Sequence, residues 1–374
     1  MKVDWLIVGA GFTGCTLAER IASQLDRRVL LVDRRSHVGG NAYDCYDQHG
    51  MLVHKYGPHI FHTNSKKVWN YLSRFTEWRP YFHHVLATVE GKRVPLPFNL
   101  NSMAALMPAR YAEKLECLLL QNFGMGAKVP ILKLREVAND DLRFLANYIY
   151  ENVFYGYTLK QWEYKPEELD ASVTGRVPVY ISRDDRYFQD SFQAMPKPGF
   201  SPLFARMLDD PRIHVLLQTD YRQILADVKF NRMVFTGPIH KFFDNAHGPL
   251  PYRSMRFEHT TLDTEWHQEV AVVNFPNDYD FLRITEQKYL TGQTAPKTTL
   301  VKEYSQMHVE GENEPYYPIP RPENRELYAL YTKTAEKLNG SVLFAGRLAD
   351  YKYYNMDQAV ARALKLFEEE VAIR

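Results

Sequence analysis

The first forty residues carry the pattern that most restricts how this chain can fold. Residues 3–8 read VDWLIV and predict a buried strand, and GAGFTG follows at once over 9–14. Apolar residues then recur at helical spacing over 15–25, and RVLLV at 28–32 predicts a second strand that ends on Asp33. A GxGxxG turn between a strand and a helix, with an acid about 20 residues further on, is typical of a dinucleotide-binding unit. A purely structural glycine turn is the alternative.

The parts of this pattern have a chemical reason. Gly9, Gly11 and Gly14 permit the tight turn and let the backbone come close to a pyrophosphate. The free N–H groups at the start of the predicted helix favour the phosphates. Asp33 suits an adenosine ribose that carries both hydroxyls. Together with Thr13, which lies inside the turn, these residues are predicted to bind the cofactor.

Composition sets broad limits on function. With 374 residues, of which 45% are hydrophobic and 24% charged, we expect a globular protein of two or three domains. The net charge of +1 gives no support for a nucleic-acid or membrane-surface partner. Cys15, Cys45 and Cys117 form no CxxC pair, which fits a reducing compartment. No secretory signal and no run of about 18 apolar residues occurs, so we expect a cytoplasmic protein.

The expected secondary structure changes along the chain. Residues 66–75 and 101–152 are expected to be largely helical. From about 165 to 325, short segments rich in Val, Tyr, Phe and Thr alternate with turn residues, which predicts an antiparallel sheet. A strand at 342–346 and a helix from about 356 to 370 return to the α/β pattern. The dinucleotide domain is therefore expected to be discontinuous, opened by the N-terminus and closed by the C-terminus.

A second glycine pair distinguishes between dinucleotides. Asp33-Arg34 is followed by Gly39-Gly40-Asn41. A glycine doublet after the ribose acid resembles that of large FAD-binding families, which include the amine oxidases. Its physical sense is a second close approach of the backbone, lower down the same cofactor. We therefore predict FAD, with Arg34, Gly40 and Asn41 among the residues that bind it.

Three histidines, His54, His59 and His62, lie in the segment HKYGPHIFHT. No acid or cysteine stands at ligand spacing and Gly-Pro makes a turn, so metal binding is the weaker interpretation. Surface histidines are the plainer alternative. We predict that His59 faces the flavin and that Ile60 beside it also contacts the cofactor.

Many further motifs follow in order along the chain. They are GGNAYD (39–44), KYGPHIFHT (55–63), PLPFNL (95–100), GYTLKQW (156–162), Arg176-Val177-Pro178, Asp185-Arg186-Tyr187-Phe188, Arg283-Ile284-Thr285-Glu286, Pro315-Tyr316-Tyr317-Pro318 and Gly346-Arg347-Leu348 with Tyr353. In this order, and from residue 3 to about 365, the chain resembles the bacterial UDP-galactopyranose mutases.

The resemblance implies an isomerase that interconverts UDP-galactopyranose and UDP-galactofuranose without net oxidation or reduction. Reduced FAD is the implied cofactor, and its N5 acts as the nucleophile on C1 of the sugar. A cellular reductant such as NAD(P)H, a homodimer, and a product used in cell-surface polysaccharide biosynthesis are also implied. The alternatives are a flavin oxidase of the amine-oxidase type and a non-catalytic binding module that keeps the FAD fold.

The implied fold is α/β and has three parts. They are a discontinuous FAD-binding Rossmann-type domain (1–80, 195–245 and 328–374), a small helical domain (98–165), and a six-stranded antiparallel sheet domain for the substrate (81–97, 166–194 and 246–327).

The resemblance also implies the residues of the site. Arg176 and Arg283 match the family's two pyrophosphate arginines, and guanidinium groups suit that role because they donate bidentate hydrogen bonds. The tyrosines that match its diphosphate-binding positions are Tyr187, Tyr317 and Tyr353. Further implied substrate contacts are His83, Val153, Tyr157, Thr158, Trp162, Phe188 and Asn274. The implied catalytic set is Arg176, Arg283, Tyr317, Tyr353 and His59. The implied flavin contacts near the C-terminus are Gly346, Arg347, Tyr354, Asn355, Met356, Asp357 and Gln358.

Two positions depart from the family pattern. His83 stands where an asparagine is frequent, and Val153 stands where an aromatic residue is frequent. Both are expected near the nucleotide or the sugar, so they bear on substrate contacts and leave the reaction class unchanged.

Overall fold

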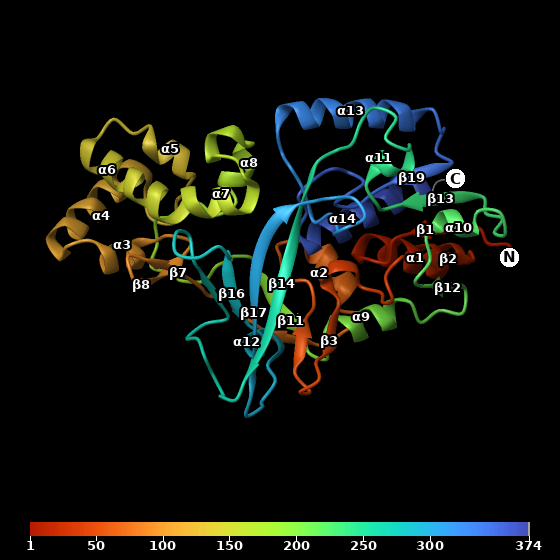
Figure 1. The fold of residues 1–374 in the computed structure, drawn as a ribbon, viewed down its shortest axis with the longest axis horizontal. Helices are drawn as coiled ribbons and strands as arrows, with labels where there is room; N and C mark the ends of the chain where they lie inside the picture. Colours follow the sequence, from red (N-terminus) through yellow and green to blue (C-terminus); the bar gives the residue numbers. More distant parts are fainter. Residues whose placement is uncertain (373–374) are drawn as a thin grey trace. The chain divides into compact units, whose positions relative to one another are not determined.

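The computed structural model describes residues 1–372, except for the side chains of residues 172 and 174. Within this range the chain forms two compact units, and most of their elements are labelled in Figure 1. The first unit contains Met1–Pro80, Asp190–Ser254 and the described residues from His308 onward, and the second contains Tyr81–Gln189 and Met255–Met307. The chain therefore enters the first unit three times. The finer division into three domains stays a prediction.

The first unit has a five-stranded parallel sheet at its core. The strand order is β12 (Ile213–Leu216), β2 (Val29–Val32), β1 (Trp5–Val8), β13 (Arg232–Phe235) and β19 (Val342–Phe344). All four residues of β2 are buried, which explains its unbroken apolar sequence, because a central parallel strand is covered on both faces. Helix α1 (Phe12–Leu25) follows β1 almost directly and buries most of its first eleven residues. The predicted strand–turn–helix–strand unit and the α/β class are confirmed.

Further helices and two small sheets complete the first unit. The helices are α2 (Lys66–Leu72), α9 (Phe200–Met207), α10 (Tyr221–Ile224), α11 (Ile239–Phe242), α13 (Pro322–Glu336) and α14 (Met356–Leu366). The small sheets are β3 (Asp44–Tyr46) with β4 (Leu52–His54), and β5 (Phe61–Thr63), β11 (Phe192–Pro196) and β6 (Trp78–Pro80). Helices α1 and α14 pack against each other, so the two ends of the chain belong to one core.

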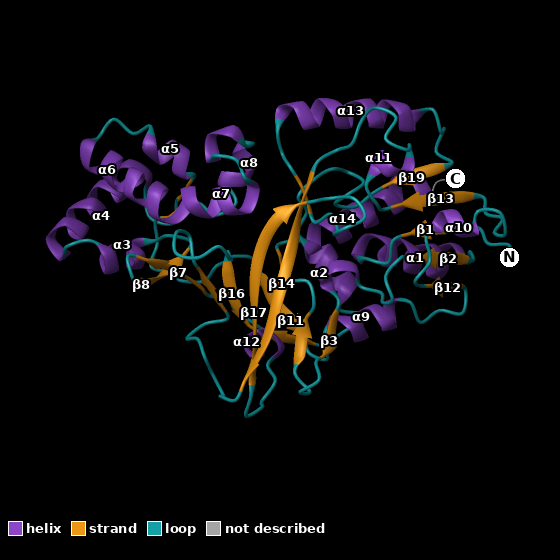
Figure 2. Cartoon of the chain, viewed as in Figure 1, coloured by secondary structure: helices purple, strands orange, loops and turns teal. Residues whose placement is uncertain are grey.

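The second unit combines a sheet with a group of helices (Figure 2). Its strands, in spatial order, are β8 (Lys92–Leu96), β7 (Val85–Val89), β15 (Val272–Asn274), β16 (Arg283–Glu286), β17 (Thr298–Met307) and β14 (Tyr252–Leu262). The long strand β14 starts in the first unit, where Tyr252 and Arg253 pair with β18 (Tyr317–Pro318).

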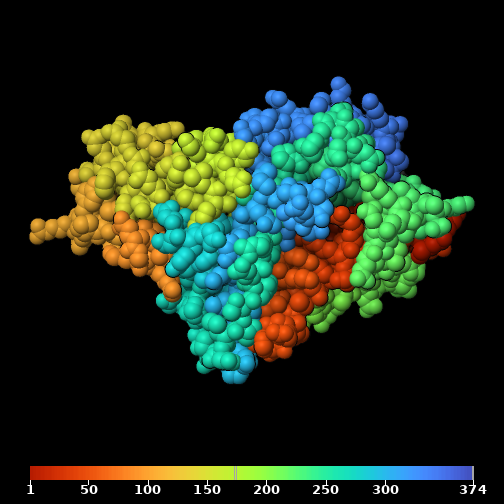
Figure 3. All heavy atoms as spheres, viewed as in Figure 1, coloured from red at the N-terminus to blue at the C-terminus, as the bar shows by residue number. Residues whose placement is uncertain are grey.

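The helices of the second unit come mainly from one stretch of chain. They are α3 (Leu100–Leu106), α4 (Ala109–Phe123), α5 (Ile131–Arg135), α6 (Asp140–Ile149), a π-helix (Tyr150–Tyr155), α7 (Gly156–Trp162), α8 (Ala171–Thr174) and, from a later segment, α12 (Gln287–Thr291). A short ladder of β9 (Lys128–Val129) with β10 (Val179–Tyr180) interrupts the predicted helical stretch. In the space-filling view the yellow segment between about 110 and 165 forms one continuous packed mass (Figure 3).

Two details of the sheet prediction are wrong. Strands β7 and β15 pair in parallel, so the large sheet is not fully antiparallel, and its order contains seven strands instead of six. Strands β12 and β13, inside the stretch expected to be antiparallel, belong to the parallel sheet of the first unit. Short apolar runs bounded by turn residues look alike in both kinds of sheet, because burial, and not strand direction, selects their residues.

Candidate functional site

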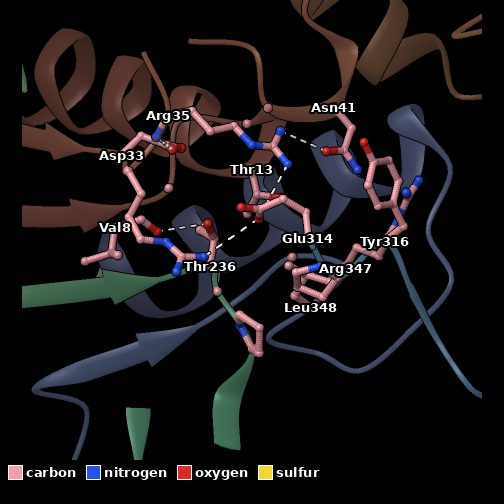
Figure 4. Close-up of a pocket in the computed structure, with 18 of the residues that line it drawn as sticks. Val8, Thr13, Asp33, Arg35, Asn41, Thr236, Glu314, Tyr316, Arg347 and Leu348 are labelled. Carbon is pink, nitrogen blue, oxygen red and sulfur yellow. Dashed lines mark hydrogen bonds and ion pairs between the residues drawn. The ribbon is translucent and has the colours of Figure 1, made fainter. Parts of the chain in front are cut away.

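The first unit contains a cavity of about 710 Å³ beside the carboxyl ends of its parallel strands. Val8, Val32 and Phe235 are the last residues of β1, β2 and β13, and all three line the cavity. Figure 4 shows how residues from the N-terminal, middle and C-terminal segments of the chain surround it. The crevice outside the carboxyl ends of the strands is where open α/β sheets bind their ligands.

Two glycines of the first loop, Gly9 and Gly14, leave no room for a side chain. Gly9 has a φ of +104°, and a Cβ there would lie 2.0 Å from Oγ1 of Thr236. A Cβ on Gly14 would lie 1.9 Å from the carbonyl oxygen of Gly9. The Thr236 hydroxyl donates to the carbonyl of Val8 over 2.9 Å and so joins the ends of β13 and β1. Glycine is needed here because helix α1 begins immediately beside the strand that precedes it.

The second glycine pair packs against the first loop. The N–H of Gly39 donates to the carbonyl of Ala10 over 2.7 Å. A Cβ on Gly40, whose φ is +56°, would lie 3.0 Å from the Cα of Gly11. Gly39 and Gly40 both line the cavity. Two backbone loops therefore approach each other closely and shape the wall on which a cofactor can lie, while the predicted approach of this pair to the cofactor stays a prediction.

The Asp33 carboxylate joins the first glycine loop to the segment that follows β2. One oxygen accepts from the N–H of Ala10 over 2.7 Å, and the other accepts from the N–H of Arg35 over 2.9 Å. The Arg35 guanidinium donates to Oδ1 of Asn41 over 2.9 Å, as drawn in Figure 4. A carboxylate oxygen of Glu314 lies 3.8 Å from the Arg35 guanidinium. Each carboxylate oxygen of Asp33 has a second lone pair, so it can still accept from a ribose hydroxyl.

Most of the predicted cofactor residues line this cavity. They are Gly9, Gly11, Thr13, Asp33, Arg34, Gly40, Asn41, His59, Gly346, Arg347, Tyr354, Asn355 and Met356. Four others have neighbouring roles. Gly14 packs on Gly9, Ile60 precedes β5, Asp357 accepts a hydrogen bond from the Thr63 hydroxyl, and Gln358 accepts one from the N–H of Asn355. All of these assignments to a cofactor stay predictions.

The three histidines of the 54–63 segment have separate partners. Nδ1 of His54 accepts from the N–H of His59 over 3.1 Å. Burial lowers the pKa of His54 to about 4, so its ring is neutral near pH 7. Nδ1 of His59 lies 2.9 Å from the carbonyl of Gly57, and His62 pairs with Asp190 over 2.9 Å. Of the three, His59 lines the cavity.

Arg283, in the second unit, is held by a buried acid. It opens β16, opposite Asn274 on β15 and Glu303 on β17. Its guanidinium lies 2.9 Å from one carboxylate oxygen of Glu303, and the Thr285 hydroxyl donates to the other over 3.2 Å. Glu303 is 1% exposed, so this is not the surface ion pair that a lone arginine usually forms. Asn274 is buried, and no hydrogen-bond partner for its Oδ1 occurs among the described residues.

An aromatic cluster surrounds His83 in the same unit. Its ring lies 5.7 Å from the ring of Tyr187 and 6.0 Å from that of Phe188, and it is buried. The N–H of Tyr187 donates to the carbonyl of His83 over 2.7 Å. Nδ1 of His83 lies 3.1 Å from the Tyr81 hydroxyl. His83 is therefore a neighbour of Tyr187 and Phe188 although about a hundred positions separate it from them in sequence.

The remaining predicted substrate residues of the second unit lie on two consecutive helices and one loop. Val153 is buried in the π-helix, and Thr158 and Trp162 are buried on α7. Tyr157, also on α7, is partly exposed. Arg176 follows α8 and is exposed. The π-helix directly connects α6 to α7, and such a helix is an unusual local structure that often marks a functional segment.

Two predicted tyrosines stack in the first unit. The rings of Tyr317 and Tyr353 lie 4.7 Å apart and nearly parallel. The Arg347 guanidinium lies 5.3 Å from the first ring and 5.6 Å from the second, and it donates to the carbonyl of Tyr354 over 2.6 Å. The structure thus brings residues 317, 347 and 353 together.

Several lining residues of the cavity have no counterpart in the sequence prediction. They are chiefly Asp220, Tyr221, Arg222, Thr236, Gly237, Pro238, Lys241, His308, Glu310 and Glu314. The Thr236-Gly237-Pro238 turn carried a usable signal, since it ends the short strand RMVF at 232–235. The acidic segment around Glu310 carried none, because its ion pair with Lys241 depends on tertiary structure.

Within residues 1–372, no three His, Cys, Asp or Glu side chains gather closely enough to hold a metal ion. None of the helices in that range is both long and apolar enough to cross a membrane.

Comparison with known proteins gives two family matches. The model of the UDP-galactopyranose mutase family matches residues 152–353, and that of a NAD(P)-binding Rossmann-like domain matches residues 7–75. The first match contains most of the predicted substrate residues, and the second contains the glycine loops.

Relatives match along almost the whole chain. A probable UDP-galactopyranose mutase of Klebsiella pneumoniae is 38% identical over 370 residues, which cover 97% of this chain and 94% of the relative. A dTDP-fucopyranose mutase of Escherichia coli is 33% identical over 373 residues, which cover 96% of each chain. The fold is similar to a crystal structure of reduced UDP-galactopyranose mutase, with a TM-score of 0.75, 14% identity, and coverage of 100% of this chain and 95% of the other.

Proposed function

The chain belongs to the UDP-galactopyranose mutase family, and we propose that it interconverts UDP-galactopyranose and UDP-galactofuranose with reduced FAD as its cofactor. The observation that carries the proposal is the 38% identity to a probable UDP-galactopyranose mutase over 97% of the chain. The aligned residues include both units of the chain, and not only the Rossmann-type fold that many oxidases share.

The cavity of the first unit fits FAD. Its volume of about 710 Å³ lies within the range of cofactor pockets, and its wall includes Gly9, at which a Cβ would collide with Thr236. Asp33 stands at the end of β2, where a ribose hydroxyl can donate to it. The N-terminal turn of α1 is open to a pyrophosphate, because Gly11, Phe12 and Thr13 all line the cavity.

Bound FAD in its reduced form would supply the nucleophile that bonds to the anomeric carbon of the sugar. The residues of the chain have to hold UDP while it is detached, since negative charge grows on the diphosphate as the bond breaks. Arg283 suits this role because its pairing with Glu303 orients the guanidinium. Arg176, Tyr187, Tyr317 and Tyr353 are proposed as the other diphosphate contacts.

The start of helix α14 suits the negative charge of the reduced cofactor. Asn355 caps this eleven-residue helix, and Asn355, Met356 and Ala359 line the cavity. N–H groups at a helix N-terminus favour a negative charge, and reduced flavin carries one on its pyrimidine ring. We propose that this helix stabilises the cofactor in its reduced form.

A dTDP-sugar is a second candidate substrate. The observation that favours it is the 33% identity to a dTDP-fucopyranose mutase over 96% of the chain. The reaction class would be the same, and the nucleoside (base and pentose) and the substituent of the transferred sugar would differ. Val153 and His83, which depart from the family pattern, are the residues proposed to bear on this choice.

Product analysis tests the proposal. The purified protein is reduced with dithionite, given UDP-galactofuranose or dTDP-fucofuranose in separate reactions, and its products are separated by chromatography. We expect many turnovers for one reduction and a higher kcat/KM for the UDP-sugar. Equal rates from oxidised and reduced protein would contradict the proposed mechanism. Sugar oxidation matched to the oxidant consumed would support an oxidase, and a protein that binds no flavin would support a binding module.

A further inference from the structure

Lys160, in the middle of the GYTLKQW segment, donates hydrogen bonds to three backbone carbonyls. Its ammonium lies 2.8 Å from the carbonyl oxygen of Tyr279 and 3.3 Å from that of Phe281, and it also bonds to the carbonyl of Phe275. All three carbonyls belong to the connection between β15 and β16. The side chain is about half-buried, and burial lowers the pKa of the ammonium. An ammonium with three carbonyl acceptors forms charge-assisted bonds, which are stronger than neutral ones.

The connection that Lys160 holds joins two predicted substrate residues. Asn274 is the last residue of β15 and Arg283 is the first of β16, and the two stand opposite each other in the ladder. The N–H of Phe275 donates to the carbonyl of Leu282 over 2.9 Å, which closes the turn immediately beyond that pair. A shift of this turn would therefore move the end of the ladder that carries Arg283.

The same turn is attached to the helices at two further points. Nδ2 of Asn277 lies 3.2 Å from the carbonyl of Glu151 and 3.4 Å from that of Asn152, both in the π-helix. A Cβ on Gly156 would lie 2.1 Å from Oδ1 of Asn277. The turn thus packs directly on the backbone at the junction of the π-helix and α7. Only glycine leaves the space for it.

We propose that Lys160 is a positioning residue of the mutase reaction: it fixes the β15–β16 turn, and with it Arg283, relative to the α7 helix that carries Thr158 and Trp162. The proposal rests on the proposed function, since it assigns Arg283 and the α7 residues to one substrate. Lys160 itself touches backbone, so its effect on the reaction passes through Arg283. Reacting groups must be placed within a fraction of an ångström, and a neutral side chain at 160 cannot replace three charge-assisted bonds.

The test compares three lysine variants. Lys160→Met removes the ammonium, Lys160→Arg restores a cation with different geometry, and Lys133→Met removes an exposed lysine of α5 as the matched control. We expect Lys160→Met to lower kcat by roughly 10- to 100-fold, as for a small misplacement of a catalytic group, while the dissociation constant for UDP changes much less. Lys160→Arg should recover part of the loss, and Lys133→Met should match the wild type.

Hydrogen exchange gives a readout that does not depend on activity. Amides of residues 275–283 should exchange faster in Lys160→Met than in the wild type, while those of the first unit should not change. If Lys160→Met does not fold, Asn277→Ala tests the same turn through its other attachment, with a smaller loss of kcat expected.

Three results would overturn the proposal. They are a wild-type kcat in folded Lys160→Met, unchanged exchange over 275–283, and loss of UDP binding in proportion to the loss of kcat. If the wild type shows no mutase activity, the proposed function fails, and the exchange measurement still decides whether Lys160 holds the turn.

Discussion

The two predicted binding regions differ in what they are made of. In the first unit, the cavity is bounded by glycine loops that leave little room for a Cβ: it would collide at Gly9 and at Gly14 behind it, and at Gly40 it would lie 3.0 Å from the Cα of Gly11. In the second unit, Arg283 depends on the side chain of Glu303 and on strand register. A backbone wall cannot accept one additional atom, because the atoms that would have to move belong to strands and helices. A side-chain site can lose one side chain without such a collision.

The two regions should therefore respond differently to mutation. Changes at the glycines that have no room for a Cβ should act on folding and cofactor retention together. Changes in the second unit should act on the chemical step and leave the flavin in place.

The largest effect is expected for Gly14→Ala. Its Cβ would lie 1.9 Å from the carbonyl oxygen of Gly9, so β1 and α1 would have to separate, at a cost of about 3 kcal/mol or more. Gly11→Ala is the matched control, because its φ of −82° suits alanine and its nearest neighbour is 3.9 Å away. We expect Gly14→Ala to lose both thermal stability and flavin, and Gly11→Ala to lose flavin alone, since its methyl enters the cavity. The ratio of flavin absorbance to protein absorbance measures flavin content, and thermal unfolding measures stability. A Gly14→Ala variant that retains its flavin would refute the interpretation that packed backbone bounds this cavity.

Arg283→Ala should affect the reaction and not the cofactor. Loss of an oriented guanidinium is expected to raise the barrier by about 3–4 kcal/mol, which is two to three decades in kcat. kcat and kcat/KM should fall by a similar factor with normal FAD content, and Arg283→Lys should recover only part. Arg256→Ala, which removes a surface pair with Glu258, should change either constant by a few-fold at most. Near wild-type turnover in Arg283→Ala would remove this residue from the site.

Asp33→Ala tests the main side-chain contact in the backbone-built pocket. The carboxylate accepts from two backbone N–H groups and is predicted to accept from the ribose. Charge-assisted bonds of this kind contribute about 1.5–3 kcal/mol, so FAD should bind roughly ten- to a hundredfold more weakly. Asp33→Asn keeps one acceptor oxygen and should lie between the wild type and Asp33→Ala. Titration of the apoprotein with FAD gives the affinities, and an unchanged dissociation constant in Asp33→Ala would show that the carboxylate does not contribute.

The smallest effect concerns pH and the buried His54. Its folded pKa of about 4 is below the ordinary value of 6.5, so the unfolded chain binds more protons between these values. The stability that the neutral His54 ring contributes is present above pH 6.5 and is lost as the pH falls toward 4, with a loss of roughly 1 kcal/mol by pH 5.5. His54→Gln cannot titrate, so its unfolding midpoint should fall less than that of the wild type between pH 7 and 5.5. His214→Gln, at an exposed position on β12, should follow the wild type. Identical pH profiles for all three proteins would show that His54 does not contribute.

Sequence patterns predicted the first unit better than the second. The β1–α1–β2 unit, the glycine pair and the C-terminal strand and helix lie where they were expected. Local sequence is sufficient there because a tight turn needs glycine and a buried parallel strand needs an unbroken apolar run. Strand direction in the large sheet was not predictable, and the parallel pairing of β7 with β15 was missed. Those two strands are joined by a connection of more than 180 residues, which leaves no local trace of their direction.

The sequence alone determined two things about this protein. The order of its motifs determined its membership of a mutase family, and its glycines determined the positions where two backbone segments pack closely. Tertiary structure decided which side chains act together. Glu303 reads as an ordinary charged residue of a strand, and Lys160 as one more surface lysine of a helix. They acquire their partners because β17 lies beside β16 and because the β15–β16 turn packs on Gly156. The ion pair of Glu303 spans 20 residues and the carbonyl contacts of Lys160 span more than a hundred, and both depend on strand register and helix packing, which no local pattern encodes.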